Sequence, residues 1–456
     1  SAKLEELGGI YIKFLQIVVL NLDPQKQRNY KDLLAVYEQS KPDSIHIWSY
    51  LGGNLSAYQL SQIKRVTEEP FATGSFGQVY RAELASGQEV VVKVLRPSVE
   101  KYLRYDLRLI GLLSQAFSLV DKQNIINFRS MFKQFKQSSL LETDYIHEAQ
   151  VANHYYQRYA DHPSMVIPKT YLELSNRRVI VQEYVHGLSV TSVLELQTNG
   201  HDPQAYVSET LNSDLFHQLQ VVGAELLGKA VLGEIMQADP HPGNIILLPN
   251  NKVALIDFGM SSYLATNRFA FYEMLVQYVK FYSGNLAIED FSMSALKFLE
   301  PDLHEAITHA DKLLGEQVTG DNSMQNKVKS AVREMFDDES NQPMIARLLD
   351  QKMIMKVLFF AINKGNRFGF SFDLQAINLI KAAQNYLMLM GQFDKDGIVI
   401  YNVLKEVVEM AENNFDQVVD MQAGNTDPAE TIETLSHWLD KMARNDPWLM
   451  NKLAEG

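Results

Sequence analysis

Residues 237–259 read QADPHPGNIILLPNNKVALIDFG and set the expectations for the rest of the chain. Asp239 stands five positions before Asn244, and a second aspartate, Asp257, begins an Asp-Phe-Gly turn. This order is typical of the acidic half of a phosphoryl-transfer site, where carboxylate and amide oxygens bind the magnesium of a triphosphate. We expect Asp257 and Asn244 to hold the metal. Asp239 would face the acceptor, orient a hydroxyl or water and take its proton.

The same stretch has a simpler interpretation, because Asp, Pro, Gly and Asn are also the commonest turn formers. Around it, the apolar pattern predicts two short strands, 245–248 and 252–256, joined by a Pro-Asn-Asn turn. These strands would hold Asn244 and Asp257 at opposite ends of one hairpin. A helix over 204–232, apolar on one side, would lead the chain into this motif.

Length and composition bound the possible functions. A chain of 456 residues is too long for one ordinary core, so we expect two or three packed units. The formal net charge of −13 argues against nucleic-acid binding and against a polybasic membrane anchor. The chain contains no cysteine, which excludes disulfides, thiolate zinc sites and cysteine nucleophiles and fits an intracellular protein. No apolar run is long enough to span a bilayer, and no signal peptide is recognisable.

A glycine-containing loop comes after the point near Val66 where strand character begins. Residues 72–77 read ATGSFG, with Gly74 and Gly77 at two positions of a nucleotide-binding glycine loop and Ala72 at the first. In such loops backbone amides, here including that of Ser75, can close over phosphates because no side chain obstructs them. Two glycines alone are weak support, so the interpretation depends on the strand that the chain forms after this loop.

One lysine interrupts the apolar strand predicted over 89–95, which comes after a hairpin turn at 85–88. A buried Lys93 is costly unless it is paired, and nucleotide phosphates and a carboxylate are its usual partners. Glu148, in a helix predicted over 141–149, is the natural carboxylate. The alternatives are an edge strand with an exposed lysine and a helix whose acids are simply solvated.

The stretch 178–187 is interpreted as a second buried strand that runs out into a linker ending at Gly187. In a two-lobed nucleotide enzyme this linker would be the hinge, where the backbone of Glu183 and Val185 would meet the adenine edge. Between 97 and 137 the pattern is helical, and it forms an insert between Lys93 and its carboxylate partner.

Helical patterns dominate both ends of the chain. Residues 4–22 predict an amphipathic helix on which Lys13 and Gln16 project from one side, and packing on the core or a membrane surface would explain it equally well. Residues 41–44 and Gly52-Gly53 are expected to be loops or caps. After Gly259 the chain is expected to be helical to its end, without a catalytic constellation. The expected segments are 269–281, 291–299, 353–362, 403–419 and a last helix capped by Asp427.

Together these motifs resemble the UbiB/AarF atypical kinase family over most of residues 4–400. The motifs that carry the resemblance are ATGSFGQV (72–79), VVKV (91–94), ETD (142–144) followed by Glu148, ADPHPGN (238–244) and DFG (257–259). The resemblance implies an α+β, bilobal protein-kinase-like fold with a small β-rich N-lobe and a helical C-lobe. We expect an N-terminal helical extension over the active site (1–65), the N-lobe with its insert (66–186), the C-lobe (187–400) and C-terminal helices (401–456).

The resemblance also implies roles for single residues. Lys93 and Glu148 would form an ion pair, Asp239 would be the catalytic-loop acid, and Asn244 with Asp257 would hold magnesium. Four further residues match family motifs: Glu142 and Asp144 match its Glu-x-Asp motif, and Lys13 and Gln16 match its N-terminal Lys-x-Gly-Gln motif.

Two positions depart from the family pattern. Leu15 replaces a glycine in the N-terminal motif, so the covering helix is expected to sit differently. Gly74 stands where the family usually has alanine. Because glycine frees the backbone to close on phosphates, we hypothesise tighter ATP binding than an alanine would allow.

The expected function is an ATP-dependent atypical kinase or ATPase, with ATP and Mg²⁺ as cofactors, that supports ubiquinone or other isoprenoid-lipid metabolism at a membrane. Its partners would be a nucleotide, an isoprenoid lipid or quinone precursor, and a membrane surface or biosynthetic proteins, with a cytoplasmic or peripheral membrane location. Two alternatives stay open. One is a small-molecule phosphotransferase of the aminoglycoside or choline kinase type, and the other is a nucleotide-binding scaffold without turnover.

Overall fold

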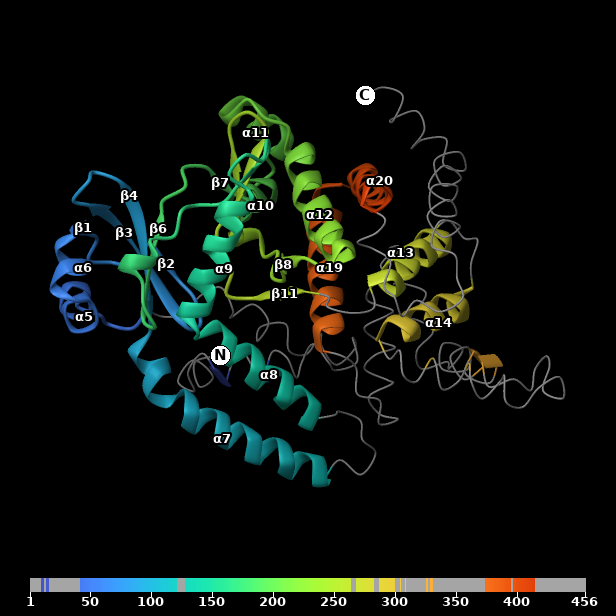
Figure 1. The fold of residues 1–456 in the computed structure, drawn as a ribbon, viewed down its shortest axis with the longest axis horizontal. Helices are drawn as coiled ribbons and strands as arrows, with labels where there is room; N and C mark the ends of the chain where they lie inside the picture. Colours follow the sequence, from blue (N-terminus) through green and yellow to red (C-terminus); the bar gives the residue numbers. More distant parts are fainter. Residues whose placement is uncertain are drawn as a thin grey trace. The chain divides into compact units, whose positions relative to one another are not determined.

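The computed structural model describes residues 42–120, 128–263, 268–282, 287–299, 374–394 and 397–414, with a few single positions elsewhere. The chain divides into two compact units (Figure 1). The first comprises residues 1–192 and 243–260, and the second comprises 193–242 and 261–456.

An antiparallel sheet, five-stranded in the described part of the chain, forms the first unit's centre. Its strands are β1 (Ile63–Val66), β2 (Ala72–Thr73), β3 (Gly77–Leu84), β4 (Glu89–Leu95) and β6 (Val179–Glu183). The predicted turn over 85–88 joins β3 to β4, with Gly87 at φ +87, a left-handed conformation that glycine adopts without strain.

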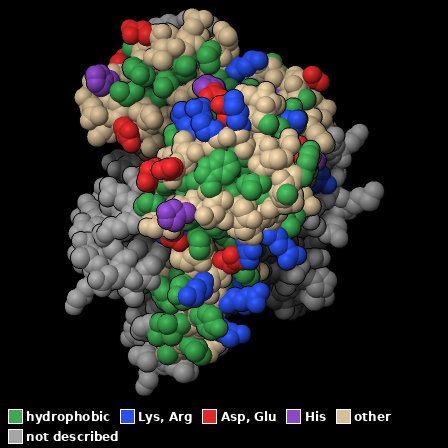
Figure 2. Space-filling view, turned by 90° about the vertical axis from the view of Figure 1, so that its left-hand side faces the viewer, with side chains coloured by type: hydrophobic (Ala, Val, Ile, Leu, Met, Phe, Trp, Pro, Cys, Tyr) green, Lys and Arg blue, Asp and Glu red, His purple; other side chains and the backbone are tan. Residues whose placement is uncertain are grey.

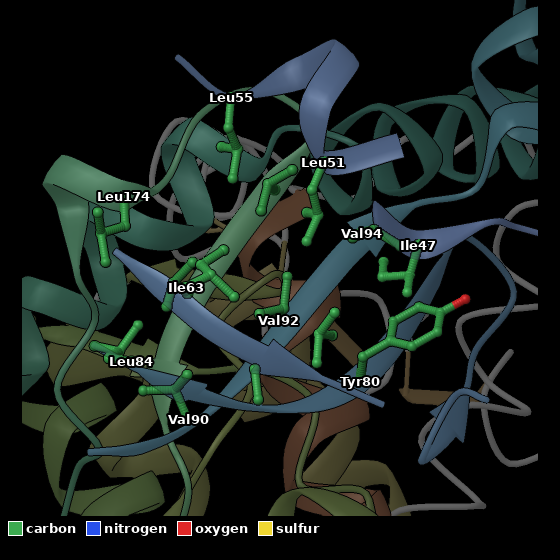
Figure 3. Close-up of a cluster of buried hydrophobic side chains, with 14 residues drawn as sticks. Ile47, Leu51, Leu55, Ile63, Tyr80, Leu84, Val90, Val92, Val94 and Leu174 are labelled. Atoms are coloured by element: carbon green, nitrogen blue, oxygen red, sulfur yellow. The ribbon is translucent and has the colours of Figure 1, made fainter. Parts of the chain in front are cut away.

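A hydrophobic core lies between one face of this sheet and helix α5 (Ile47–Asn54), which is followed by α6 (Ala57–Ser61). Figure 3 shows Val92 of β4 pointing toward Leu51 of α5, and both side chains are fully buried. Burying an aliphatic side chain contributes about 1.5–3 kcal/mol each before entropy is counted. Because successive strand residues point to opposite faces, Lys93 lies on the other face of β4, away from this core.

The Gly52-Gly53 pair, expected to mark a loop or cap, lies inside helix α5. Glycine costs about 1 kcal/mol relative to alanine in a helix. Burial of Ile47 and Leu51 against the sheet outweighs that preference, which is a tertiary effect that a local pattern does not contain.

Three helices connect β4 to the later strands. They are α7 (Pro97–Val120), α8 (Phe128–Glu142) and α9 (Tyr145–Arg158), and α7 packs on α8. The helix expected over 141–149 is therefore two helices. Asp144 causes the break, because its side chain caps α9 by accepting a hydrogen bond from the backbone N–H of His147 at 3.1 Å.

A second small sheet in the first unit contains the predicted hairpin. Its strand order is β5 (Met165–Val166), β10 (Lys252–Leu255), β9 (Ile245–Leu248) and β7 (Leu188–Ser189), and the short helix η3 (Leu172–Leu174) precedes β6. Pairing of Ile245 with Leu255 brings Asn244 and Asp257 to the same open end of the hairpin. The expectation of opposite ends is therefore wrong. Pairing with β5 and β7 also places this hairpin in the first unit. The domain boundaries expected from the sequence place it in the C-lobe (187–400).

The described residues of the second unit are mainly helical. Its elements are α10 (Val190–Thr198, which begins in the first unit), α11 (Pro203–Leu211), α12 (Leu215–Leu232), β8 (Ile235–Gln237), η4 (Pro242–Asn244, which ends in the first unit), β11 (Ser261–Tyr263), α13 (Arg268–Tyr282), α14 (Ile288–Leu299), α19 (Leu374–Phe393) and α20 (Ile398–Asn413). Helix α12 packs on α13, α19 and α20, and the hydroxyl of Tyr386 in α19 donates to the Leu219 carbonyl at 3.0 Å.

The single helix expected over 204–232 is two helices, α11 and α12. Asn212 is left-handed at φ 49 and ends α11, and Asp214 then caps α12 by accepting from the backbone N–H of His217. Asn and Asp favour such breaks because they tolerate the left-handed region and cap helices well.

Some expectations fall outside the described residues. They are Lys13 and Gln16 with most of the helix over 4–22, the helix over 353–362, the last turns of the helix expected to end at 419, and the Asp427 cap. Within the described residues, no helix has both the length and the apolar character needed to cross a bilayer.

Candidate functional site

Lys93 and Glu148 form the centre of the site, and they lie in the first unit. The Lys93 Nζ is 2.6 Å from Glu148 Oε1, so the contact that the sequence predicts is present. Strand β4 supplies the lysine and helix α9 supplies the glutamate, whose side chain is 7% exposed. The other carboxylate oxygen, Oε2, is buried without a hydrogen-bond partner in the described part of the chain.

Asp257 also contacts the lysine. Its Oδ2 lies 3.3 Å from Lys93 Nζ, and its Oδ1 accepts a hydrogen bond from the backbone N–H of Gly259 at 2.9 Å. Phe258 is buried and packs on Tyr155 of α9 with a ring-centroid distance of 4.7 Å. The Phe258 contact therefore fixes the Asp-Phe-Gly turn on the same helix that carries Glu148.

Charge and burial oppose one another at this cluster. Burial lowers the pKa of Lys93, but the carboxylates of Asp257 and Glu148 outweigh it and hold that pKa well above its ordinary value. Burial raises the pKa of Glu148 to about 7, against the opposing effect of the Lys93 ammonium. The lysine is therefore always charged near neutral pH, whereas the glutamate titrates there.

Tyr145 is a site residue that sequence reasoning missed. It is fully buried at the start of α9, its ring centroid lies 5.3 Å from Lys93 Nζ, and its hydroxyl has no hydrogen-bond partner among the described residues. A Cβ on Gly77 would be 2.3 Å from that hydroxyl, so the glycine loop passes directly over it. The sequence spacing could have indicated Tyr145, because it precedes Glu148 by three positions and so shares its helix face.

The glycine loop joins β2 to β3. Ala72 begins β2, Gly77 begins β3, and the Gly74 backbone N–H donates to the Gly77 carbonyl at 2.9 Å. Ser75 lies between them at the tip. A Cβ on Gly74 would meet its nearest atom at 3.7 Å, which is ordinary contact, so an alanine fits this conformation. The hypothesis that Gly74 tightens ATP binding therefore concerns only loop closure and stays a prediction.

The predicted hinge follows strand β6. Glu183 ends β6, and its backbone N–H donates to the Lys169 carbonyl at 2.8 Å, while Val185 lies two residues beyond and is half-buried. Their role toward adenine stays a prediction.

The stretch 237–259, which contains Asp239, Asn244 and Asp257, is divided between the two units. The carbonyl of Asn244, in the first unit, accepts from the Ile256 N–H at 3.2 Å, beside Asp257 in the chain. Asp239 belongs to the second unit, where it is half-buried and its carbonyl accepts from the His241 N–H at 2.7 Å.

The predicted Glu-x-Asp motif spans the break between two helices. Glu142 is the last residue of α8, and Asp144 is the N-terminal cap of α9. Asp144 therefore has a structural contribution of its own, because it begins the helix that positions Glu148.

The donors at this site fit a nucleotide with magnesium. Asp257 and Asn244 offer the hard oxygen ligands that Mg²⁺ prefers, and magnesium usually takes only one or two carboxylates and completes its shell with water and phosphates. The described residues contain no cluster of three or more His, Cys, Asp or Glu that would hold a metal by themselves. Lys93 has the charged N–H donors that phosphate oxygens would accept, and a bound nucleotide would complete such a site.

Comparison with protein families matches residues 58–287, about half of the chain, to the family described as the ABC1 atypical kinase-like domain. The matched stretch includes all of the proposed Lys93, Glu148, Asp239, Asn244 and Asp257 set.

Curated relatives support the same similarity. The chain is 31% identical over 240 residues to the Arabidopsis thaliana chloroplastic protein ACTIVITY OF BC1 COMPLEX KINASE 3, which covers 52% of this chain and 32% of that protein. It is 26% identical over 285 residues to the probable protein kinase UbiB of Pseudomonas fluorescens, and this alignment covers 59% of this chain and 51% of the relative. The alignments thus span about a third to a half of these relatives. Among solved structures, a Mycobacterium tuberculosis Rv3197–erythromycin complex aligns at a TM-score of 0.42 with 19% identity, over 70% of this chain and 82% of that one.

Proposed function

This chain belongs to the ABC1 atypical kinase-like family, and on that premise we propose that it binds magnesium-ATP and transfers or hydrolyses the terminal phosphate. The observation that carries the proposal is the partly buried contact of Lys93 with both Glu148 and Asp257 in one unit. Three charged groups held this close together, on a strand, a helix and a turn, cost free energy of folding through desolvation. Such a cluster is typical of a site that binds a charged ligand.

Each residue of this set has a separate task in the proposal. Glu148 holds the Lys93 ammonium in place, and Lys93 binds the phosphates. Asp257 and Asn244 hold Mg²⁺, which when bound neutralises phosphate charge. Asp239 accepts the proton of the attacking hydroxyl or water. The glycine loop, through backbone amides, binds the remaining phosphate oxygens.

Turnover would serve isoprenoid-lipid metabolism at a membrane, as the family resemblance implies, and a surface of the first unit supports this. Helix α7 exposes a stripe of large apolar side chains at spacings of three and four residues, which we call the α7 stripe. Its members are Tyr102, Tyr105, Leu109, Leu112 and Leu113.

Basic side chains border the α7 stripe. Lys101, Arg104 and Arg108 are exposed on the same helix, while its acids are engaged, Glu100 with Arg178 at 2.5 Å and Asp106 with the Tyr11 hydroxyl at 2.6 Å. The lower end of the face in Figure 2 shows apolar side chains next to lysines and arginines. An apolar stripe with basic flanks suits a helix lying on an anionic lipid surface, despite the net charge of −13.

The helix expected over 4–22 is a less suitable membrane contact, judged by the few of its residues that the structure describes. Ile10 is buried with Phe76 and Leu103, and Phe14 packs against the same cluster. The apolar face expected at these positions is thus directed to the protein interior.

The proposed turnover is tested by phosphate release from magnesium-ATP. We compare the wild-type chain, Asp257→Asn and the control Asp161→Asn, each with and without lipid vesicles. Asp257→Asn is expected to reduce release at least about a hundredfold, because it removes a charge needed at the metal. Asp161 is exposed in the first unit, so its variant should match wild type. Equal rates for wild type and Asp257→Asn would refute the proposal.

A further inference from the structure

Arg96, the residue after β4, contacts the glycine loop at two carbonyls. Its backbone N–H donates to the carbonyl of Phe76 at 2.9 Å, and its guanidinium Nη1 donates to the carbonyl of Gly74 at 3.2 Å. Gly74 in turn closes the loop through its own hydrogen bond to the Gly77 carbonyl. Arg96 therefore binds the loop on both sides of its tip.

Asp43 binds the same guanidinium. Its Oδ1 accepts from Arg96 Nε at 2.9 Å and from Nη2 at 2.6 Å, and its Oδ2 accepts from the backbone N–H of Ser98 at 3.1 Å. A planar guanidinium held by charge-assisted hydrogen bonds at Nε and Nη2 cannot rotate without breaking them. The direction in which Nη1 points, toward Gly74, is thus set by Asp43.

Asp43 is itself fixed to the sheet by a buried glutamine. Its backbone N–H donates to Gln78 Oε1 at 2.9 Å, and its carbonyl accepts from Gln78 Nε2 at 3.3 Å. Gln78, on β3, is fully buried and also donates to the Tyr80 hydroxyl at 3.0 Å. Such a satisfied buried amide is a rigid support, because any displacement would leave polar groups unpaired.

The ion pair is largely shielded from water. The side chains of Arg96 and Asp43 are 12% and 17% exposed. Burial favours the neutral acid, but hydrogen bonds from Ser98 and Arg96 outweigh it and hold the pKa of Asp43 below its ordinary value. Asp43 is therefore a carboxylate at neutral pH, and the pair is intact.

We propose that Asp43 and Arg96 are positioning residues that preset the glycine loop for the phosphates of a nucleotide. In a planar trans peptide the C=O and N–H point in opposite directions, so binding of the Gly74 carbonyl by Arg96 turns the Ser75 N–H to the other side of the loop. That amide is one of the donors assigned to phosphate. The inference rests on the proposed nucleotide site.

The position of Asp43 in the chain has a second consequence. Asp43 precedes α5 and lies outside the stretch that matches the family domain, which begins at residue 58, whereas Arg96 lies inside it. A segment that precedes the domain thus sets the geometry of the domain's phosphate loop. Displacement of that segment would release Arg96 and loosen the loop.

The first test needs no nucleotide. Arg96→Lys keeps the charge but offers one nitrogen in place of the three that contact Asp43 and Gly74, so amides of residues 72–77 in the full chain are expected to exchange hydrogen about tenfold faster. The matched control is Arg178→Lys in the same unit. Arg178 also donates to a carboxylate and an amide, those of Glu100 and Asn54, at 2.7 and 3.0 Å. Loop exchange that is equal in wild type and Arg96→Lys would overturn the proposal.

The second test measures binding of adenosine and ATP with magnesium by titration calorimetry. Arg96→Lys and Asp43→Asn are expected to weaken ATP binding roughly tenfold and to leave adenosine binding unchanged, because only ATP uses the loop amides. A parallel loss for both ligands would indicate a general structural effect and would overturn the positioning role. Failure of the wild-type chain to bind ATP would instead contradict the proposed function, and the exchange measurement would still decide whether Arg96 holds the loop.

Discussion

Among single residues, Gly77 brings the glycine loop into close contact with Tyr145 at the start of helix α9. A Cβ at this position would be 2.3 Å from the Tyr145 hydroxyl and 3.3 Å from the Val94 carbonyl. Neither group can move freely, since Tyr145 is fully buried and Val94 belongs to the central strand β4. Glycine is required here by space, whereas at Gly74 an alanine would be accommodated.

Gly77→Ala is therefore expected to lower the free energy of unfolding by about 1–3 kcal/mol, the usual range for overpacking. Adding Tyr145→Phe removes the oxygen that clashes and should restore part of that loss. Denaturant unfolding of the two single variants and the double variant measures the coupling. Strictly additive effects would show that the clash is relieved elsewhere.

Glu148 gives the site a pH dependence with a definite sign. Its pKa is about 7 in the folded chain, against an ordinary 4.5. A group raised in this way contributes stability that is fully present below 4.5 and is lost as pH rises through about 7. The ion pair with Lys93 needs the charged form of the Glu148 carboxyl. This form is lost as pH falls below about 7.

We therefore expect kcat/KM for magnesium-ATP to fall on the acid side with an apparent pKa near 7, without a matching loss of folded protein. The measurement is phosphate release from pH 5.5 to 8.5, roughly the range in which a carboxyl so perturbed titrates, with Tm followed in parallel. The Glu148→Gln variant has no carboxyl to titrate at this position, so its residual activity should not fall on the acid side. A wild-type profile that is flat across this range would contradict the expectation.

Among the elements, helix α9 connects stability to the site, since it carries Tyr145 and Glu148 and begins at the Asp144 cap. Asp144→Ala should cost about 1 kcal/mol of stability, as loss of a cap usually does. Because the first turn of α9 would fray, magnesium-ATP turnover should also fall.

A second cap provides the control for α9. Asp202 caps α11 in the second unit by accepting from the Ala205 N–H at 3.1 Å. Asp202→Ala should cost a similar amount in urea unfolding but leave turnover unchanged. Equal effects of both variants on turnover would show that Asp144 acts only through global stability.

The α7 stripe contains none of the candidate site residues, so its role can be tested separately. Leu109→Ser combined with Leu112→Ser should reduce binding to vesicles of phosphatidylcholine with phosphatidylglycerol by about tenfold or more, since two partly exposed leucines lose their apolar burial in the membrane. Vesicle co-sedimentation measures the bound fraction.

The control for the α7 stripe removes apolar side chains elsewhere on the first unit. Tyr58 and Leu172 are 66% and 41% exposed, so Tyr58→Ser with Leu172→Ser should bind vesicles like wild type. Binding that is equally strong to pure phosphatidylcholine would contradict a role for Lys101 and Arg104.

For the whole molecule, the predicted family and the kinase-like α+β fold are confirmed by the match over residues 58–287. Apolar residues that alternate within a few positions predict strands well, as in β4 and the hairpin of β9 and β10. Helix boundaries are predicted less well. The breaks at Asp144 and Asn212 depend on single capping or left-handed residues inside otherwise continuous helical patterns.

The types and order of Lys93, Glu148, Asn244 and Asp257 are fixed by the covalent chain, and they are enough to predict a phosphoryl-transfer site. What surrounds these residues depends on the folded arrangement. Asp43 and Arg96 are far apart in the chain, and their pairing exists only once β3 and β4 are formed. The fit of Gly77 over Tyr145 likewise depends on close packing between a loop and a helix, which no local pattern contains.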